Sequence, residues 1–327
     1  MMRRKPYIDA AKGVVVLLML LAHCLPALHG NIAAELARNL INAFHMPFFF
    51  ILAGSLKSQN AEPFLLFVKR KTKRLLIPFL VANLLFLVLD MFDPEVNVGT
   101  GTIVQKLFIA MLNGGQSVSW FLLTLFFVEV LFELTRIMAG KYTICFAVIY
   151  GITGVVLGRL GINYPLKIGT VFTALSFYGL SFIFRGRLDY EKKENIIPLW
   201  LTFILSAAGM IMISGGTWEM VENDCSDYLL GSLSAFSASL GIVRLLHIVS
   251  ETPRLKLLYG FFSFVGVHSL YFYLYTGFSA TFIMHLLETI ISLPFSIKIF
   301  IYLIVFFSIY GIVFAIERLK ARNAITG

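Results

Sequence analysis

Apolar residues gather into ten long segments along the chain, separated by short polar connections. A helix needs about 20 mostly apolar residues to cross the hydrocarbon core of a bilayer, and each segment approaches that length. The pattern therefore predicts ten membrane-spanning helices, at residues 13–29, 39–56, 75–92, 118–138, 143–160, 166–184, 196–214, 226–248, 264–287 and 296–316. An eleventh, re-entrant segment is predicted near 100–115, where two glycines interrupt an apolar stretch.

The connections between these segments alternate in charge, which indicates their orientation. Lys and Arg accumulate in cytoplasmic loops because they resist translocation, and ten spans then leave both termini in the cytoplasm. The connection with Arg159 and Lys167 fits this alternation least well. The basic side holds Arg3, Arg4, Lys5, Lys12, Lys57, Lys69, Arg70, Lys71, Lys73, Arg74, Arg185, Arg187, Lys192, Lys193, Arg318, Lys320 and Arg322. The opposite side holds Asp90, Asp93, Glu95, Glu219, Glu222, Asp224 and Asp227.

Composition supports an integral membrane protein. Of the 327 residues, 58% are hydrophobic and only 14% are charged, whereas about a quarter of the residues in a soluble domain are charged. We therefore expect an all-α polytopic helix bundle that forms a single domain over residues 1–327. The net charge of +9 is explained by the cytoplasmic loops. Because no nucleic-acid-binding motif accompanies it, we expect membrane lipid and no nucleic acid as a partner.

Polar groups inside a bilayer are costly, so each one is a functional candidate. Lys12 and His23 are eleven residues apart, which places them within roughly 20° of one helix face and about 16 Å apart along the axis. Asp9 and Lys12 stand at i,i+3 and can pair. This stripe predicts a charged pair at the cytoplasmic mouth and an imidazole deep in the membrane. The alternative is a snorkelling lysine and a histidine satisfied by a neighbouring helix.

Further candidates follow along the chain. His45 precedes Pro47 by two residues, so it either faces the same cavity as His23 or satisfies the backbone that proline loosens. Trp120 is expected at the outer interface. Glu129 is expected to pair with an internal histidine or hydroxyl group. A late Gly-x-x-Ser-Leu block begins at Gly266.

The connection before the third segment is densely basic, with five positive charges within residues 69–74. Lys71 and Arg74 stand at i,i+3 and would share a helix face. Two interpretations stand from the residues alone. The run anchors the protein to anionic lipid, or it clamps an anionic cytosolic ligand such as a nucleotide phosphate.

Together these blocks resemble the membrane-bound acyltransferase family of type 3, over nearly the whole chain. The order and spacing of the first four blocks are specific to that family. One departure is Thr276, which stands where many members have histidine. The matching residues are Asp9, Lys12, Gly13 and His23, then His45, Pro47 and Gly54, then Lys71 and Arg74, then Trp120, and finally Gly266, Ser269 and Leu270.

The resemblance implies O-acyl transfer, specifically O-acetyl transfer, from cytosolic acetyl-CoA to a hydroxyl of a surface polysaccharide or lipid-linked sugar at the bacterial inner membrane. His23 would then carry the chemistry, as a base or as a covalent carrier, with Asp9 and Lys12 at the mouth of the site. Lys71 and Arg74 would bind the CoA phosphates. The acceptor would contact His45, Trp120 and Ser269. No metal is expected.

A secondary transporter or flippase for a polar or sugar-lipid substrate is the alternative, since ten helices with a polar stripe at the midplane suit that class as well. The basic pair together with a membrane-buried histidine favours the enzyme, because a transporter needs no cytosolic donor clamp. A transporter would also show inverted internal repeats, and the sequence shows no convincing repeat.

Overall fold

The computed structural model describes residues 5–25, 31–59, 62–92, 102–162, 164–185, 195–214, 218–225, 227–288, 291 and 294–326. Over these residues the protein is all-α apart from one two-stranded hairpin, which confirms the predicted fold class. Several residues that carried the orientation argument lie outside the described part, namely Arg3, Arg4, Asp93, Glu95, Arg187, Lys192 and Lys193.

The chain forms two compact units that interleave along the sequence. The first combines Met1–Arg38, Val88–Val98 and Val249–Gly327, and the second combines Asn39–Leu87 and Gly99–Ile248. The helix α2 (Ile32–Asn42) is divided between them. The single domain expected from the sequence stays a prediction.

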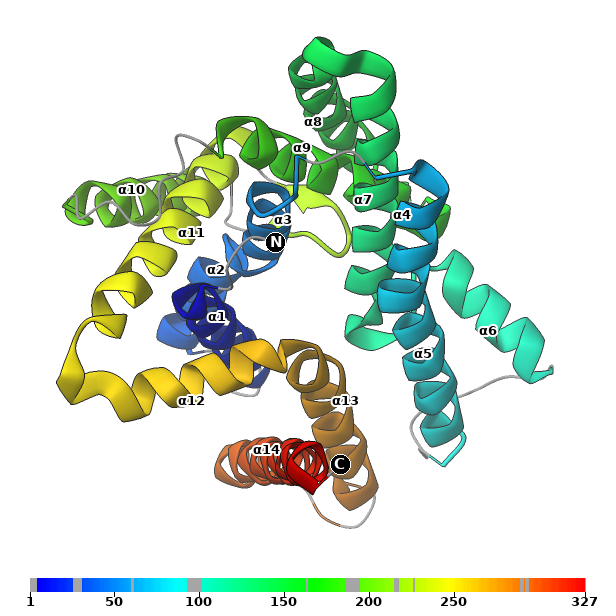
Figure 1. The fold of residues 1–327 in the computed structure, drawn as a ribbon, viewed down its shortest axis with the longest axis vertical. Coiled ribbons are helices and arrows are strands. Elements are labelled where there is room, and N and C mark those ends of the chain that lie inside the picture. Colours follow the sequence, from blue (N-terminus) through cyan, green and yellow to red (C-terminus); the bar gives the residue numbers. More distant parts are fainter. Residues whose placement is uncertain are drawn as a thin grey trace. The chain divides into compact units, whose positions relative to one another are not determined.

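The first unit is built from the two ends of the chain. It contains α1 (Pro6–Cys24), α12 (Lys256–Val267), α13 (Ser269–Glu288) and α14 (Phe295–Thr326). Figure 1 shows α13 beside α14, and the two helices contact each other. The prediction of one continuous helix over 264–287 was wrong, because the backbone breaks at His268 and separates α12 from α13.

The bounds of α1 also differ from the prediction. The helix begins at Pro6, seven residues earlier than expected, because proline is well suited to the first helical turn, and it ends at Cys24, five residues earlier than expected. Its 19 residues span about 28 Å, close to the thickness of the hydrocarbon core. Asp9 and Lys12 therefore lie in the first two turns, and His23 lies in the last turn rather than near the middle of the helix.

Two glycines bring α1 and α12 into backbone contact. A Cβ on Gly13 would overlap the carbonyl oxygen of Phe262, and a Cβ on Gly266 would overlap that of Asp9. The two glycines also face each other, because each missing Cβ would lie within 3.0 Å of the other residue's backbone nitrogen. Two sequence motifs more than 250 residues apart thus form one close helix crossing, which small residues permit.

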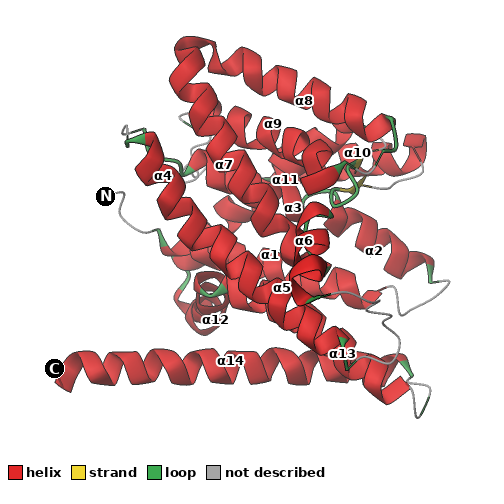
Figure 2. Cartoon of the chain, turned by 90° about the vertical axis from the view of Figure 1, so that its right-hand side faces the viewer, coloured by secondary structure: helices red, strands yellow, loops and turns green. Residues whose placement is uncertain are grey.

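The second unit is a bundle around α7 and α9. Figures 1 and 2 show α8 and α9 side by side, and α4 and α5 following one another along one line, joined by a π-helical turn, Thr72–Leu76. Its helices and strands are α3 (His45–Ser55), α4 (Phe64–Lys71), α5 (Ile77–Asp90), α6 (Ile103–Leu112), α7 (Trp120–Ala139), α8 (Thr143–Arg159), α9 (Ile168–Phe184), α10 (Ile197–Ser214), β1 (Trp218–Glu219), β2 (Asp224–Cys225) and α11 (Tyr228–Ser250).

A buried amide fixes the start of α7. Asn83 is 2% exposed. Its Oδ1 accepts from the backbone nitrogen of Gln116 at 2.7 Å, and its Nδ2 donates to Ser119 Oγ at 3.1 Å. Gly115 lies in the intervening turn with φ +104°, where a side chain would be strained and would overlap Ser119. The turn that leads into Trp120 is therefore held by α5.

Seven helical stretches in the described part are long and apolar enough to cross a membrane. The three remaining predicted spans coincide with α7, α8 and α10. Of these three helices, α7 carries three charged residues. The other two, α8 and α10, have 17 and 18 residues, fewer than the roughly 20 that a membrane-spanning helix needs. The short helix α6 covers the predicted eleventh segment, and its ten residues reach only about 15 Å, too little to cross a bilayer. The count of ten spans and the orientation of the termini stay predictions.

The glycine crossing gives a direct test. Replacing Gly13 or Gly266 with Ala should lower the thermal stability of the purified protein by several degrees, because overpacking of a close contact costs about 1–3 kcal/mol. The matched control is Gly260→Ala on α12, where a Cβ would meet nothing within 4 Å. Melting in detergent measures all three variants, and equal melting temperatures would contradict the contact.

Candidate active site

The charged pair predicted on α1 is present. Lys12 Nζ donates to Asp9 Oδ1 at 3.2 Å, and Asp9 is 7% exposed. Burial of a carboxylate is tolerated only where a partner compensates its charge. The pair lies beside the Gly13–Gly266 crossing, because the Asp9 carbonyl is the atom that Gly266 contacts. The sequence motif thus combines a charge pair with a helix contact.

His23 lines a cavity of about 170 Å³ in the first unit. His285 of α13 lines the same cavity, so a second histidine stands with the predicted catalytic one. The cavity also contains an ion pair between Lys298 Nζ and Glu288 Oε1, at 2.6 Å. The sequence analysis assigned no role to His285, and it missed the ion pair. His23 is an exposed residue at this cavity, whose other walls come from α13 and α14.

In the second unit, Lys71 forms a buried ion pair with Glu129. The sequence predicted a histidine or hydroxyl partner for Glu129, which was wrong. The missed signal is the i,i+4 spacing of Glu129 and Glu133, which puts two carboxylates on one face of α7. Such a face requires cations from another helix, and the basic run in α4 supplies one of them.

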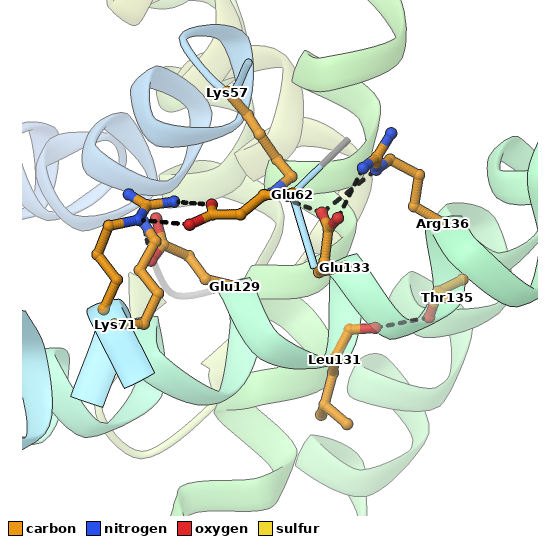
Figure 3. A network of polar contacts seen from close by, with 9 residues as sticks. Lys57, Glu62, Lys71, Glu129, Leu131, Glu133, Thr135 and Arg136 are labelled. Carbon is orange, nitrogen blue, oxygen red and sulfur yellow. Dashed lines mark hydrogen bonds and ion pairs between the residues drawn. The ribbon is translucent and has the colours of Figure 1, made fainter. Parts of the chain in front are cut away.

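The second carboxylate of α7 is compensated from two sides. Figure 3 shows Lys57 and Arg136 both directed at Glu133. Lys57 Nζ lies 2.7 Å from Glu133 Oε2, and Arg136 Nη2 lies 2.6 Å from Glu133 Oε1. Arg136 Nε also donates to Glu133 at 3.2 Å, which makes this pair bidentate. Glu133 is only 2% exposed, so its charge depends on these partners.

The expectation that Lys71 and Arg74 share a face is altered by the π-helical turn. A π turn contains more residues than the 3.6 of an α turn, so a three-residue spacing no longer brings two side chains onto one face. Lys71 is buried against Glu129, whereas Arg74 is exposed. Within the described part of the chain, Arg74 makes no ion pair, and Lys69 and Lys73 are likewise exposed.

Arg70 is occupied by an acidic residue just before α4. Its Nη2 lies 2.5 Å from Glu62 Oε2, and the hydrogen bonds from Arg70 lower the pKa of Glu62 below its ordinary value. Both side chains are partly exposed. Of the five positive charges at 69–74, Arg70 and Lys71 are thus engaged with carboxylates, which leaves three for a ligand or for lipid.

The predicted acceptor residues lie in varied environments. His45 begins α3, and its Nδ1 lies 3.0 Å from the carbonyl of Ile41, whereas the carbonyl that Pro47 leaves without an N–H partner is that of Ala43. Trp120 begins α7 and is 6% exposed, which leaves little of its ring open to a sugar. Ser269 begins α13 at the His268 break. Thr276 is 1% exposed, buried within α13.

The predicted residues divide between the two units. Asp9, Lys12, His23 and Ser269 belong to the first unit, and the second contains His45, Lys71, Arg74 and Trp120. The structure thus brings Asp9 and Lys12 together on α1, and it gives the two basic residues separate environments.

The structure combines several apolar helices that are long enough to cross a membrane with buried charge pairs and a cavity lined by histidines. These features define an integral membrane protein. The chain belongs to the acyltransferase 3 family, because residues 5–318 match its acyltransferase domain and so cover most of both units. Neither the curated proteins nor the solved structures contain a match to it. The family resemblance inferred from the sequence is confirmed, and the protein is a membrane acyltransferase.

The buried pair of Lys71 and Glu129 can be tested through stability. Lys71→Gln should destabilise the protein by about 3–5 kcal/mol, because it leaves a buried carboxylate without its partner. The double variant Lys71→Gln/Glu129→Gln should recover much of that loss. Glu62→Gln, which breaks the partly exposed pair with Arg70, is the control and should cost at most about 1 kcal/mol.

Unfolding of the purified variants in detergent, followed by circular dichroism, measures these differences. A single variant as stable as the wild-type protein would show that Lys71 does not compensate Glu129.

Proposed function

We propose that the protein transfers an acetyl group from cytosolic acetyl-CoA to a hydroxyl of a surface polysaccharide or of its lipid-linked precursor. The observation that carries the proposal is the cavity at His23, which exposes an imidazole beside a second histidine in a chain of the acyltransferase 3 family. Imidazole is the side chain best suited to exchange protons near neutral pH.

The reaction needs a base and a place for the leaving group. In direct transfer, the acceptor hydroxyl oxygen bonds to the thioester carbonyl carbon while His23 takes the hydroxyl proton. The carbon–sulfur bond then breaks, and the CoA thiolate leaves with that proton. If His23 instead carries the acetyl group, its ring nitrogen first bonds to the carbonyl carbon, and the carbon–sulfur bond breaks so that CoA leaves as a thiol with the ring proton. The acceptor hydroxyl oxygen then bonds to that carbon, the carbon–nitrogen bond breaks, and the hydroxyl proton passes to the ring nitrogen. Both routes need an imidazole that is open to a cavity.

The ion pair of Lys71 with Glu129 bears on which basic residue binds the donor. Because Glu129 neutralises Lys71, the exposed Arg74 is the stronger candidate for a CoA phosphate contact. A guanidinium can bind a phosphate bidentately, which a lysine cannot do. Lys71 then acts within the protein, where it helps to hold the π-helical turn that presents Arg74.

The acceptor is proposed to arrive from the outer side of the membrane. Asp9 and His23 lie at opposite ends of α1, about 21 Å apart along its axis. If the N-terminal end faces the cytosol, as the loop charges predict, His23 lies near the outer end. A surface glycan could then reach it without crossing the bilayer.

His23 should be essential to the chemistry. His23→Ala should leave expression and melting temperature unchanged and lower acetylation of the glycan by about 10²–10⁴-fold, the usual contribution of a general base. His247→Ala on α11 is the matched control, since His247 does not line the cavity. Mass spectrometry of the surface glycan, with and without the gene and with each variant, gives the measurement. Near-normal acetylation by the His23 variant at equal expression would refute the assignment.

Arg74 should contribute to donor affinity. Arg74→Gln should weaken acetyl-CoA binding by about tenfold or more, since a hydrogen bond to a charged group contributes about 1.5–3 kcal/mol. Lys69→Gln removes a neighbouring exposed charge and should change the affinity much less. Calorimetry on the purified variants compares them, and equal losses would reduce the run to a general electrostatic or lipid-anchoring role.

A further inference from the structure

A second cavity lies in the second unit, between the facing ends of α8 and α9, where the turn of the β1–β2 hairpin meets them. Its volume is about 360 Å³, and residues from 157–162, 164–170 and 221–224 line it. Pockets that bind small ligands typically measure about 300–1,000 Å³. None of the residues assigned to acyl transfer above lines this cavity.

The cavity has rigid walls, because one buried asparagine ties the hairpin to both helices. Thr173 Oγ1 of α9 donates to Asn223 Oδ1 at 2.7 Å, and Asn223 Nδ2 donates to the Gly154 carbonyl of α8 at 2.8 Å. Gly158 and Gly169 face Asn223: a Cβ on Gly158 would overlap its carbonyl oxygen, and a Cβ on Gly169 would lie only 3.0 Å from its Nδ2. The hairpin therefore sits in a groove made by two glycines, and the cavity keeps its shape without a ligand.

The backbone at the start of α9 is held in an uncommon conformation. Leu166 and Lys167 have φ of 58° and 53°, and Asn223 across the cavity has φ of 55°. Residues other than glycine adopt this left-handed region at a cost, and such positions concentrate at functional sites. Here the result is that Lys167 Nζ reaches Glu222 at the cavity, 3.2 Å from Oε1 and 3.3 Å from Oε2.

The lining favours a polyhydroxyl ligand over an anion. Glu222 and Asp224 supply two carboxylates against the single ammonium of Lys167, so a phosphate would be repelled. Carboxylates accept hydrogen bonds from hydroxyls, and Lys167 beside Glu222 offers a donor and an acceptor next to each other, as two neighbouring hydroxyls of a sugar require. Tyr164 adds an aromatic ring, whose face can pack against the apolar side of a sugar.

We propose that this cavity is a carbohydrate-binding subsite that holds a sugar residue of the acceptor glycan. The proposal rests on the proposed function, because it takes the acceptor to be a glycan. Both loops that form the cavity are assigned to the outer side by the loop-charge pattern, which is where a surface glycan would be. It also accounts for Lys167, the basic residue that fitted the alternation of loop charges least well, since Glu222 of the neighbouring outer loop neutralises it.

The test uses the purified full-length protein and, as the probe, non-acetylated surface polysaccharide isolated from cells that lack the gene. Glu222→Gln and Tyr164→Ala should each raise the KM for the polysaccharide about tenfold or more and leave the affinity for acetyl-CoA unchanged. Glu219→Gln is the matched control, since Glu219 is an acidic residue of the same hairpin that does not line the cavity. Melting temperatures establish that the variants fold.

The possible outcomes separate the two proposals. If the wild-type protein acetylates the polysaccharide and both cavity variants keep its KM, the subsite is refuted and the proposed function stands. A rise in KM for the cavity variants alone, with acetyl-CoA binding intact, supports the subsite. A wild-type protein that does not acetylate the polysaccharide overturns the proposed function, and the subsite with it.

Discussion

Charge compensation within an apolar helix bundle is the constraint on which the second unit depends. The carboxylates of Glu129 and Glu133 are buried on one face of α7, in surroundings where an unpaired charge would be expelled or neutralised. Lys71, Lys57 and Arg136 provide the partners. The contacts of Lys57 and Lys71 hold the chain before and within α4 against α7 and so fix the position of the basic run. The exposed arginine that we assign to donor binding is positioned by an ion pair one helical turn before it.

The same constraint explains how a basic run can serve two purposes. Anchoring to lipid and binding of an anionic ligand both need exposed cations, and the structure leaves only part of the run exposed. Arg70 and Lys71 are engaged with acidic residues, whereas Lys69, Lys73 and Arg74 are not. The π-helical turn contains Lys73 and Arg74 and begins directly after Lys71, so it sets these two exposed cations apart from the engaged pair. A regular α-helix through 64–90 would turn Arg74 toward the face on which Lys71 is buried.

Much of the fold could be predicted from apolar segment lengths, because membrane-spanning helices leave a strong local signal. Each of the ten predicted segments overlaps one or more helices in the described part. The prediction failed where the backbone departs from a regular helix, at the break beside His268 and at the π turn, since neither has a side-chain periodicity of its own. Asp9 and Lys12 were found through their spacing. The partners of Glu129, the pairing of Gly13 with Gly266, and the cavity around Asn223 join residues distant in sequence, and a single sequence contains no record of such contacts.

The Gly13–Gly266 crossing has a consequence for biosynthesis. During synthesis α1 is made well before its closest packing partner, α12, which follows only after some 230 further residues. The second unit, contiguous from residue 99 to residue 248, can assemble in the interval, because domains form as their segments become available. Until α12 arrives, the partner of Asp9 within α1 is Lys12. The first unit is therefore completed only after the segments of the second unit have been made, and its histidine-lined cavity must wait for α13 and α14.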